Sequence, residues 1–228
     1  MQSLDLLANN MANASTGGYK GDSEFHTVFV SEAANEDGSS TPSSLPVIQR
    51  AWTDFSQGLL EPTDNPLDLG LQGKGFFVAQ GPSGPLYTRN GSLHVSSDGT
   101  LLTASGYPIL QKDGQTIQAK PNQPIEVSTD GSIQQAGQPL GQLQLVDFQD
   151  QSAIVKYGNN YFQNAGTVDP ADATETQVLQ GKVEASNVSA SHGAVRLVSV
   201  MRQFEMMQKA ISISNDMGRE AIEQVAKV

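Results

Sequence analysis

The chain has 228 residues, of which 37% are hydrophobic and 16% charged, with 22 glycines and 11 prolines. This composition predicts many turns and short strands rather than a compact cytosolic enzyme. The net charge of −11 argues against a nucleic-acid partner, because such affinity depends on Lys and Arg, and the absence of cysteine excludes disulfides, thiolate metal sites and cysteine nucleophiles.

The N-terminal segment predicts a short amphipathic helix. Leu4, Leu7, Met11 and Ala14 are spaced to share one helical face, and the helix is expected to end before Gly17. The first residues contain neither the basic nor the apolar region of a signal peptide, and no apolar run reaches the roughly 20 residues that cross a bilayer. We therefore expect no membrane insertion and, for an exported protein, a route without a cleaved signal peptide.

Residues 21–51 are predicted to be a connecting segment, with a possible strand at 25–30 and a polar loop at 32–46. From residue 52 to residue 188 the sequence predicts a central antiparallel β domain, built from short apolar runs between turn dipeptides. The predicted hairpin turns are Asn90-Gly91, Asp98-Gly99, Asp113-Gly114 and Asp130-Gly131. The predicted strands are 75–80, 86–90, 92–96, 101–104, 125–128, 141–148 and 153–157.

A long helix is predicted from about residue 194 to the C-terminus. Its heptad-like seam consists of Val200, Phe204, Met207, Ile211, Ser214, Gly218, Ala221, Val225 and Val228. Such a stripe fits either a helix packed on its own domain or a helix with a coiled-coil partner. The similar stripe at the N-terminal end of the chain favours a partner.

Residues that could support catalysis or bind a cofactor do not form a recognisable site. His26, His94 and His192 have no second metal ligand at a suitable spacing. The glycines of residues 70–75 have neither the Walker spacing nor the dinucleotide-binding spacing, and they lead into a strand, whereas a phosphate-binding loop leads into a helix. The sequence therefore predicts no cofactor, no metal and no enzymatic activity. A secreted β-rich binding module and a carboxylate hydrolase stay open as alternatives at this point.

Residues 4–20 read LDLLANNMANASTGGYK. This segment resembles the N-terminal signature of one known family, that of the flagellar basal-body rod and hook proteins. Further similar segments follow in the same order, at residues 53–58, 65–69, 73–78, 87–91, 183–188 and 202–206. The resemblance covers essentially the whole chain.

The resemblance implies a mainly β fold with α-helical termini, in which residues 1–20 and 189–228 form an axial coiled-coil region and the β domain an outer layer. It implies a structural subunit of the periplasm-spanning rod of the basal body, exported by the flagellar type III apparatus. Its partners would be further copies of itself and other rod or hook subunits. The implied assembly interface comprises Leu4, Leu7, Asn9, Asn10, Met11, Asn13, Val200, Phe204, Met207, Ile211, Ala221 and Val225.

This chain departs from the family pattern in a few places. Family members usually carry further helical residues before the position of Leu4, and they more often have glycine at the position of Asp64 and leucine at that of Val183. The short connection between Lys20 and Arg50 favours the proximal-rod type over the distal-rod type. The small β region makes a hook protein the less favoured alternative.

Overall fold

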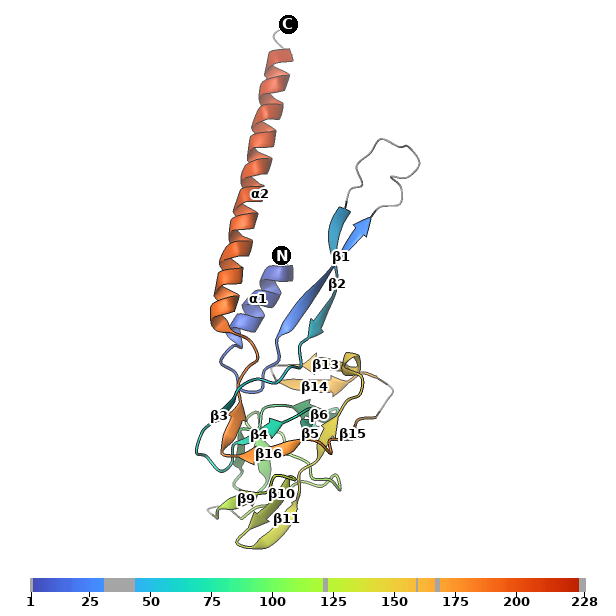
Figure 1. Cartoon of the computed structure of the whole chain (residues 1–228), viewed down its shortest axis with the longest axis vertical. Helices are drawn as coiled ribbons and strands as arrows, with labels where there is room; N and C mark the ends of the chain where they lie inside the picture. The colour runs from blue at the N-terminus through green and yellow to red at the C-terminus, as the bar shows by residue number, and fades with distance from the viewer. Residues whose placement is uncertain (1, 31–43, 121–122, 159, 167–168, 226–228) are drawn as a thin grey trace. The chain divides into compact units, whose positions relative to one another are not determined.

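The computed structural model describes residues 2–30, 44–120, 123–158, 160–166 and 169–225 (Figure 1). Side chains are described for residues 3–23, 52–120, 123–158, 160–166 and 169–219. The chain divides into two compact units, residues 1–12 with 189–228 and residues 13–188. The fold is mainly β, with a short N-terminal helix and one long C-terminal helix, which confirms the predicted fold class at that level.

The terminal unit consists of α1 (Gln2–Ala12) and α2 (Ala190–Val225). The two helices lie side by side where Gly193 faces Met11: a Cβ added to Gly193 would lie 3.6 Å from the Met11 Cγ. Ser189 begins α2, because its hydroxyl accepts a hydrogen bond from the His192 N–H at 3.3 Å. At about 1.5 Å per residue, α1 is roughly 16 Å long and α2 roughly 54 Å.

The first strands of the β unit form a hairpin, β1 (Asp22–Val30) with β2 (Ser44–Thr53). The predicted loop at 32–46 is wrong for residues 44–46, which belong to β2. Its remaining residues, 32–43, lie outside the described residues. Two further strand pairs join distant parts of the chain. They are β3 (Leu60–Pro62) with β17 (Lys182–Glu184), and β4 (Leu69–Gln72) with β16 (Gln177–Gln180).

A six-stranded antiparallel sheet lies at the centre of the β unit, in the order β13-β14-β6-β5-β12-β15. Its strands are β5 (Phe76–Gly81), β6 (Gly84–Thr88), β12 (Leu145–Asp147), β13 (Ile154–Tyr157), β14 (Tyr161–Asn164) and β15 (Ala171–Asp172). The 3-10 turn η2 (Gln151–Ala153) precedes β13. Smaller sheets contain β7 (Leu93–Val95), β8 (Leu101–Thr103), β9 (Ile125–Val127), β10 (Ser132–Gln135) and β11 (Gln138–Gln142).

Strand β5 is buried on both faces, which explains why its sequence is apolar without alternation. Successive side chains of a strand point to opposite faces. Accordingly, Phe77 and Ala79 belong to one buried cluster, whereas Phe76 and Val78 belong to a second. The second cluster is rich in aromatic rings, with the Phe76 ring 5.7 Å from that of Phe162.

The turn predictions hold for three of the four dipeptides, since Gly99, Gly114 and Gly131 have φ of 89°, 79° and 82°. The predicted hairpin turn at Asn90-Gly91 is wrong, because β6 and β7 pair with other strands. A Cβ on Gly91 would lie 1.8 Å from the Leu69 carbonyl oxygen. Glycine therefore permits a close approach of two backbones here rather than a turn.

The single strand predicted at 141–148 is also wrong, because this segment contributes to two strands in different sheets. Strand β11 pairs with β10, while β12 pairs with β5. Between them, Leu143 forms an isolated bridge with Gln111. An apolar pattern continues across such a change of sheet, so that periodicity alone does not reveal it.

Candidate assembly surfaces and a buried ionic clamp

The predicted C-terminal interface follows one face of α2, termed here the seam. Val200, Phe204, Met207 and Ile211 share this face because they are three or four residues apart. Val200 is half-buried, whereas Phe204, Met207 and Ile211 are 48%, 65% and 57% exposed. Two further predicted residues lie within α2 with side chains outside the described residues, namely Ala221 and Val225.

The predicted N-terminal interface lies on α1 and just after it. Leu4, Leu7 and Met11 are half-buried, and Met11 packs near Gly193 in the first turn of α2. Three polar members of the predicted set are partly to well exposed, namely Asn9, Asn10 and Asn13. The structure thus brings the end of α1 to the beginning of α2. Most of α2 extends past the length that α1 can cover.

Within the β unit, three buried charged side chains form a cluster termed here the ionic clamp: Lys20, Arg89 and Glu184. They are 0%, 3% and 1% exposed. The Lys20 Nζ donates to Glu184 Oε1 at 2.6 Å, and the Arg89 Nη1 donates to Glu184 Oε2 at 3.2 Å. One carboxylate therefore bridges two cations that lie far apart in the sequence.

Backbone groups add further hydrogen bonds to the ionic clamp. The Gly58 N–H donates to Glu184 Oε1 at 2.8 Å. Lys20 Nζ also donates to the Ser56 carbonyl at 2.7 Å, and Arg89 Nη2 to the Gly73 carbonyl at 2.7 Å. Buried charges are tolerated only when paired and hydrogen-bonded in this way.

Burial sets the electrostatics of the ionic clamp. Removal from water lowers the pKa of Lys20, and the charge and hydrogen bond of Glu184 oppose that shift. Burial likewise lowers the pKa of Arg89, and the charge and hydrogen bond of Glu184 oppose that shift. The Arg89 guanidinium lies 5.3 Å from the centroid of the Phe76 ring, whose electron-rich face attracts the cation. The single carboxylate of the clamp, that of Glu184, thus stabilises the charged forms of two buried cations.

A shell of hydrogen bonds holds the segments that carry the ionic clamp. The Gly18 N–H donates to the Glu184 carbonyl at 2.6 Å, and the Gly21 N–H donates to Asn187 Oδ1 at 2.8 Å. Asn187 Nδ2 in turn donates to the Asp54 carbonyl at 2.7 Å. Residues 18–21, the segment just after β2 and residues 184–187 at and beyond the end of β17 are thereby tied together.

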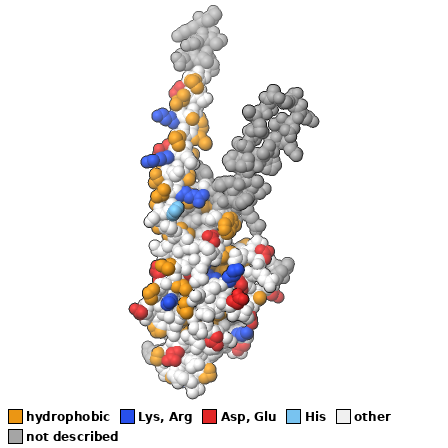
Figure 2. Space-filling model, viewed as in Figure 1, with side chains coloured by type: hydrophobic (Ala, Val, Ile, Leu, Met, Phe, Trp, Pro, Cys, Tyr) orange, Lys and Arg blue, Asp and Glu red, His pale blue; other side chains and the backbone are white. Residues whose placement is uncertain are grey.

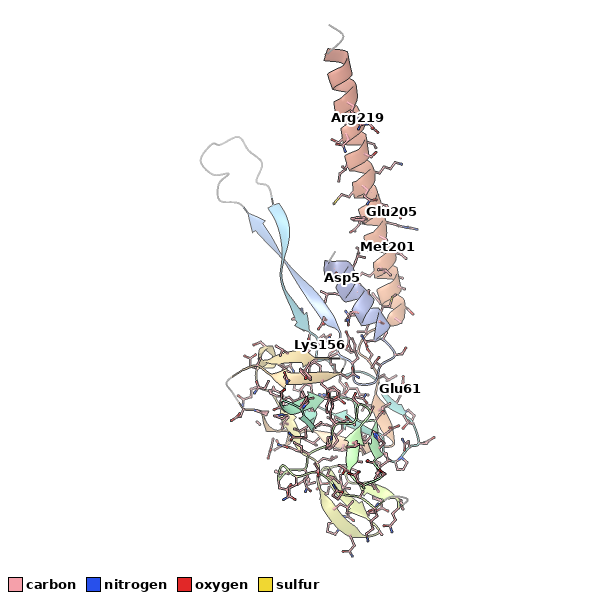
Figure 3. All side chains as sticks on the ribbon, turned by 180° about the vertical axis from the view of Figure 1, so that it is seen from behind. Asp5, Glu61, Lys156, Met201, Glu205 and Arg219 are labelled. Carbon is pink, nitrogen blue, oxygen red and sulfur yellow. The ribbon has the colours of Figure 1, made fainter. Side chains whose placement is uncertain are left out.

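Tyr19 adds a second polar contact beside the clamp. It is 3% exposed, and the Lys156 Nζ lies 4.5 Å from the centroid of its ring (Figure 3). Lys156 also pairs with Asp22 at 2.8 Å. Burial, with a smaller contribution from the Asp22 charge, raises the pKa of Tyr19 to about 12. The phenol is therefore held in its neutral form.

The residues of the ionic clamp, with the backbone partner Gly73, lie in segments that carry the family resemblance. Lys20 closes the segment 4–20, Gly73 opens 73–78, Arg89 lies in 87–91 and Glu184 in 183–188. Sequence analysis gave these residues no role, since Lys20 and Glu184 are 164 positions apart and no local pattern pairs them. The sequence offered one indication of the clamp, namely that these charged residues stand beside apolar and small residues at the ends of strands.

The described side chains include no group of three or more His, Cys, Asp or Glu suited to a metal ion. His94 and His192 are exposed, and the side chain of His26 lies outside the described residues. Gly73 has φ of 115°, with the position of a Cβ 3.3 Å from the Glu175 carbonyl oxygen. Among the described helices, none has the length and apolar character to span a membrane.

Comparisons with known proteins give a consistent result. A family model for the flagellar hook protein FlgE/F/G D1 domain matches residues 70–135, and one for the C-terminal part of flagellar basal body rod FlgEFG proteins matches residues 179–224. The chain is 34% identical to the flagellar basal-body rod protein FlgF of Caulobacter vibrioides, over 99% of this chain and 92% of the relative. It is 32% identical to FlgF of Mesorhizobium japonicum, over 93% and 89%. It is also 32% identical to FlgG of Buchnera aphidicola subsp. Schizaphis graminum, over 94% and 90%.

Proposed function

The chain belongs to the family of flagellar basal-body rod proteins, and from this premise we propose that it is a structural subunit of the rod, of the FlgF type. The family predicted from sequence is confirmed. The observation that carries the proposal is the match to FlgF of Caulobacter vibrioides along 99% of the chain. Similarity to FlgG supports the distal rod as the second candidate within the same family.

We propose that the subunit polymerises through its terminal helices. In this proposal the predicted interface residues of α1 and α2 pack against other subunits in an axial coiled-coil layer, and the β unit forms the outer layer. The exposed seam supports this role, because Phe204, Met207 and Ile211 are large apolar side chains whose exposure to water is unfavourable. The predicted division into 1–20 with 189–228, 21–51 and 52–188 stays a prediction.

The ionic clamp has a mechanical role in this proposal. Both covalent links from the β unit to the helices, after residue 12 and after residue 188, leave from segments that the clamp and Asn187 hold together. A load applied through the helices would therefore reach the β unit at a buried cluster of ion pairs and hydrogen bonds. Such a joint suits a rod that transmits the torque of the motor.

Three further points complete the proposal. The subunit reaches the periplasm through the flagellar type III export apparatus without a cleaved signal peptide, and it assembles there with other rod and hook subunits. Its place is the basal body. We propose no catalytic activity, in keeping with a structural family.

The test is a change from Phe204 to Asp in the full chain. A carboxylate buried in a helix interface without a partner costs several kcal/mol, and about 3 kcal/mol corresponds to roughly a hundredfold loss of affinity per contact. We expect Phe204→Asp to abolish polymers in electron micrographs and motility in cells, while the monomer keeps its thermal transition.

The matched control is Ser212→Asp, which adds the same charge one residue after Ile211 and away from the seam. Ser212 is exposed, so this variant should polymerise and support swimming. Polymers and motility retained in Phe204→Asp would contradict the proposed interface. Loss of both in the control as well would point to the charge itself.

A further inference from the structure

Trp52 stands exposed beside an open groove in the β unit. Its side chain is 51% exposed, although tryptophan is on average a highly buried residue. Two hollows flank it, of about 830 Å³ and about 500 Å³, and both are lined by Trp52, Phe55 and Gln151. Because the two hollows share these residues, they form one continuous groove, termed here the aromatic groove.

The apolar part of the aromatic groove rests on the packed core. The Phe55 ring lies 5.7 Å from the Phe76 ring and 5.1 Å from the Phe162 ring, so it is fixed on the second buried cluster. Val155, which is 45% exposed, lines the smaller hollow. Two of the three large apolar side chains that are exposed in the described part of the β unit, Trp52 and Val155, thus border this groove. Exposed apolar surface that gathers at one place marks a binding site.

The larger hollow adds hydrogen-bonding groups to this apolar surface. The Ser56 N–H donates to Asp54 Oδ1 at 2.9 Å. The Phe148 N–H donates to Asp147 Oδ1 at 2.8 Å. The backbone therefore holds both carboxylates in place, and a carboxylate has about four acceptor positions, so both can accept further hydrogen bonds. Gln149 is exposed in the same hollow, and its amide offers both donors and an acceptor.

The charge of the β unit disfavours an anionic ligand. Residues 13–188 contain eight basic and nineteen acidic residues, a net charge of −11. Figure 2 shows acidic side chains spread over the visible face of the β unit. Among the described residues that line the larger hollow, Lys74 is the one cation, beside Asp54 and Asp147. The negative excess repels phosphates, sulfates and nucleic acids, and Lys74 opposes the entry of a cation.

The backbone around the aromatic groove disfavours an added peptide strand. Strand β12, which supplies Asp147, is paired on both sides, by β5 and by β15. Strand β13 lies at the edge of the sheet beside the smaller hollow, but the Ile154 N–H already donates to the Gln151 carbonyl. A peptide that extends a sheet needs a row of open backbone groups. Side chains therefore make up most of the recognition surface.

We propose that the aromatic groove binds a neutral oligosaccharide built of pyranose rings. In a pyranose with equatorial hydroxyls, the hydroxyls surround the rim and the C–H bonds leave an apolar face. These slightly positive C–H bonds pack on the electron-rich face of Trp52. The hydroxyls donate to the carboxylates of Asp54 and Asp147 and bond with the Gln149 amide. The proposed site is separate from the assembly of the rod and does not depend on it.

A fluorescence titration of the full chain tests this proposal, because Trp52 is the only tryptophan in the sequence. The probes are N-acetylchitotriose and cellotriose, which differ in their acetamido groups. We expect a saturable blue shift, because a stacked sugar removes the indole from water. Sorbitol, which has hydroxyls but no ring, should give no shift at the same concentration. A response to one of the two sugars alone would support the proposal and identify the substituent that the groove recognises.

Variants of the full chain place the binding in the groove. Trp52→Ala should lower the affinity at least about tenfold in a calorimetric titration. Trp52→Phe keeps an aromatic face and should retain most of the affinity. The matched control is Leu59→Ala, which removes an apolar side chain that is 70% exposed and lies outside the groove, and it should bind like the wild type. Because these positions are exposed, all three variants should keep the circular dichroism spectrum of the wild type.

The proposal is overturned by the absence of a saturable shift with both trisaccharides, by a shift that sorbitol reproduces, or by unchanged affinity in Trp52→Ala. A response to oligolysine and to neither sugar would assign the groove to a basic peptide and would also overturn it. None of these outcomes affects the rod proposal, which Phe204→Asp tests separately.

Discussion

Replacement of Glu184 by Gln removes the charge from the ionic clamp and keeps its size. Lys20 and Arg89, which are 0% and 3% exposed, then remain buried without the charge of the carboxylate that pairs with both of them. Breaking a buried pair in this way costs about 3–5 kcal/mol. Since a domain has about 5–15 kcal/mol of stability in total, the β unit should lose a large part of its own.

Urea unfolding of the full chain measures this loss. Circular dichroism reports the strands, and Trp52, the single tryptophan, gives a fluorescence signal from the β unit. The matched control is Glu61→Gln, since Glu61 is an exposed carboxylate that pairs across β3 and β17 with Val183 (Figure 3). It should change the free energy of unfolding by less than about 0.5 kcal/mol.

A second variant separates charge from packing. Adding Lys20→Met to Glu184→Gln removes one of the two uncompensated cations, and it should recover part of the lost stability. A free energy of unfolding for Glu184→Gln within about 1 kcal/mol of the wild type would refute the account of the clamp. No recovery in the double variant would show that the loss came from packing alone.

Three further outcomes are expected. Because the pKa of Tyr19 rises from 10.0 to about 12 on folding, its contribution to stability is complete below pH 10 and is lost between pH 10 and about 12. Urea titrations at a series of pH values should show this loss in the wild type and not in Tyr19→Phe. An identical pH profile of the two proteins would contradict the prediction. Asp64 has φ of 58°, a conformation that glycine adopts easily and a β-branched residue does not. Asp64→Gly should therefore change the free energy of unfolding by less than about 1 kcal/mol, and Asp64→Val should lower it by about 1–2 kcal/mol. Equal effects of the two variants would refute this backbone argument. Gly91→Ala should cost about 2–4 kcal/mol in thermal unfolding because of the Leu69 carbonyl, and a neutral effect would show that the backbones separate freely.

Sequence reasoning succeeded where local pattern determines structure. The unbroken apolar run of β5 and the Asp-Gly turns follow from side-chain burial and from positive φ, which short segments encode. The C-terminal helix follows from its period. Gly91 could not be assigned in this way, because its role depends on Leu69, which lies in another strand.

The functional residues divide along the same line. The seam was visible in the sequence as a heptad-like pattern of apolar residues. The ionic clamp required the fold, since Lys20, Arg89 and Glu184 meet only after distant strands have paired. The positions of these three charged residues in the sequence do not indicate that their side chains are in contact.

The absence of cysteine from the chain allows a direct test of the assembly in cells. Phe204→Cys places one thiol on the seam and Ser212→Cys places one away from it, and both positions are exposed in the single chain. In isolated basal bodies, a maleimide should modify Ser212→Cys and leave Phe204→Cys unmodified, whereas both should react in the monomer. A Phe204→Cys thiol that reacts as readily in the basal-body fraction as in the monomer, or a chain that is missing from that fraction while the cells swim, would contradict a rod subunit that assembles through its C-terminal helix.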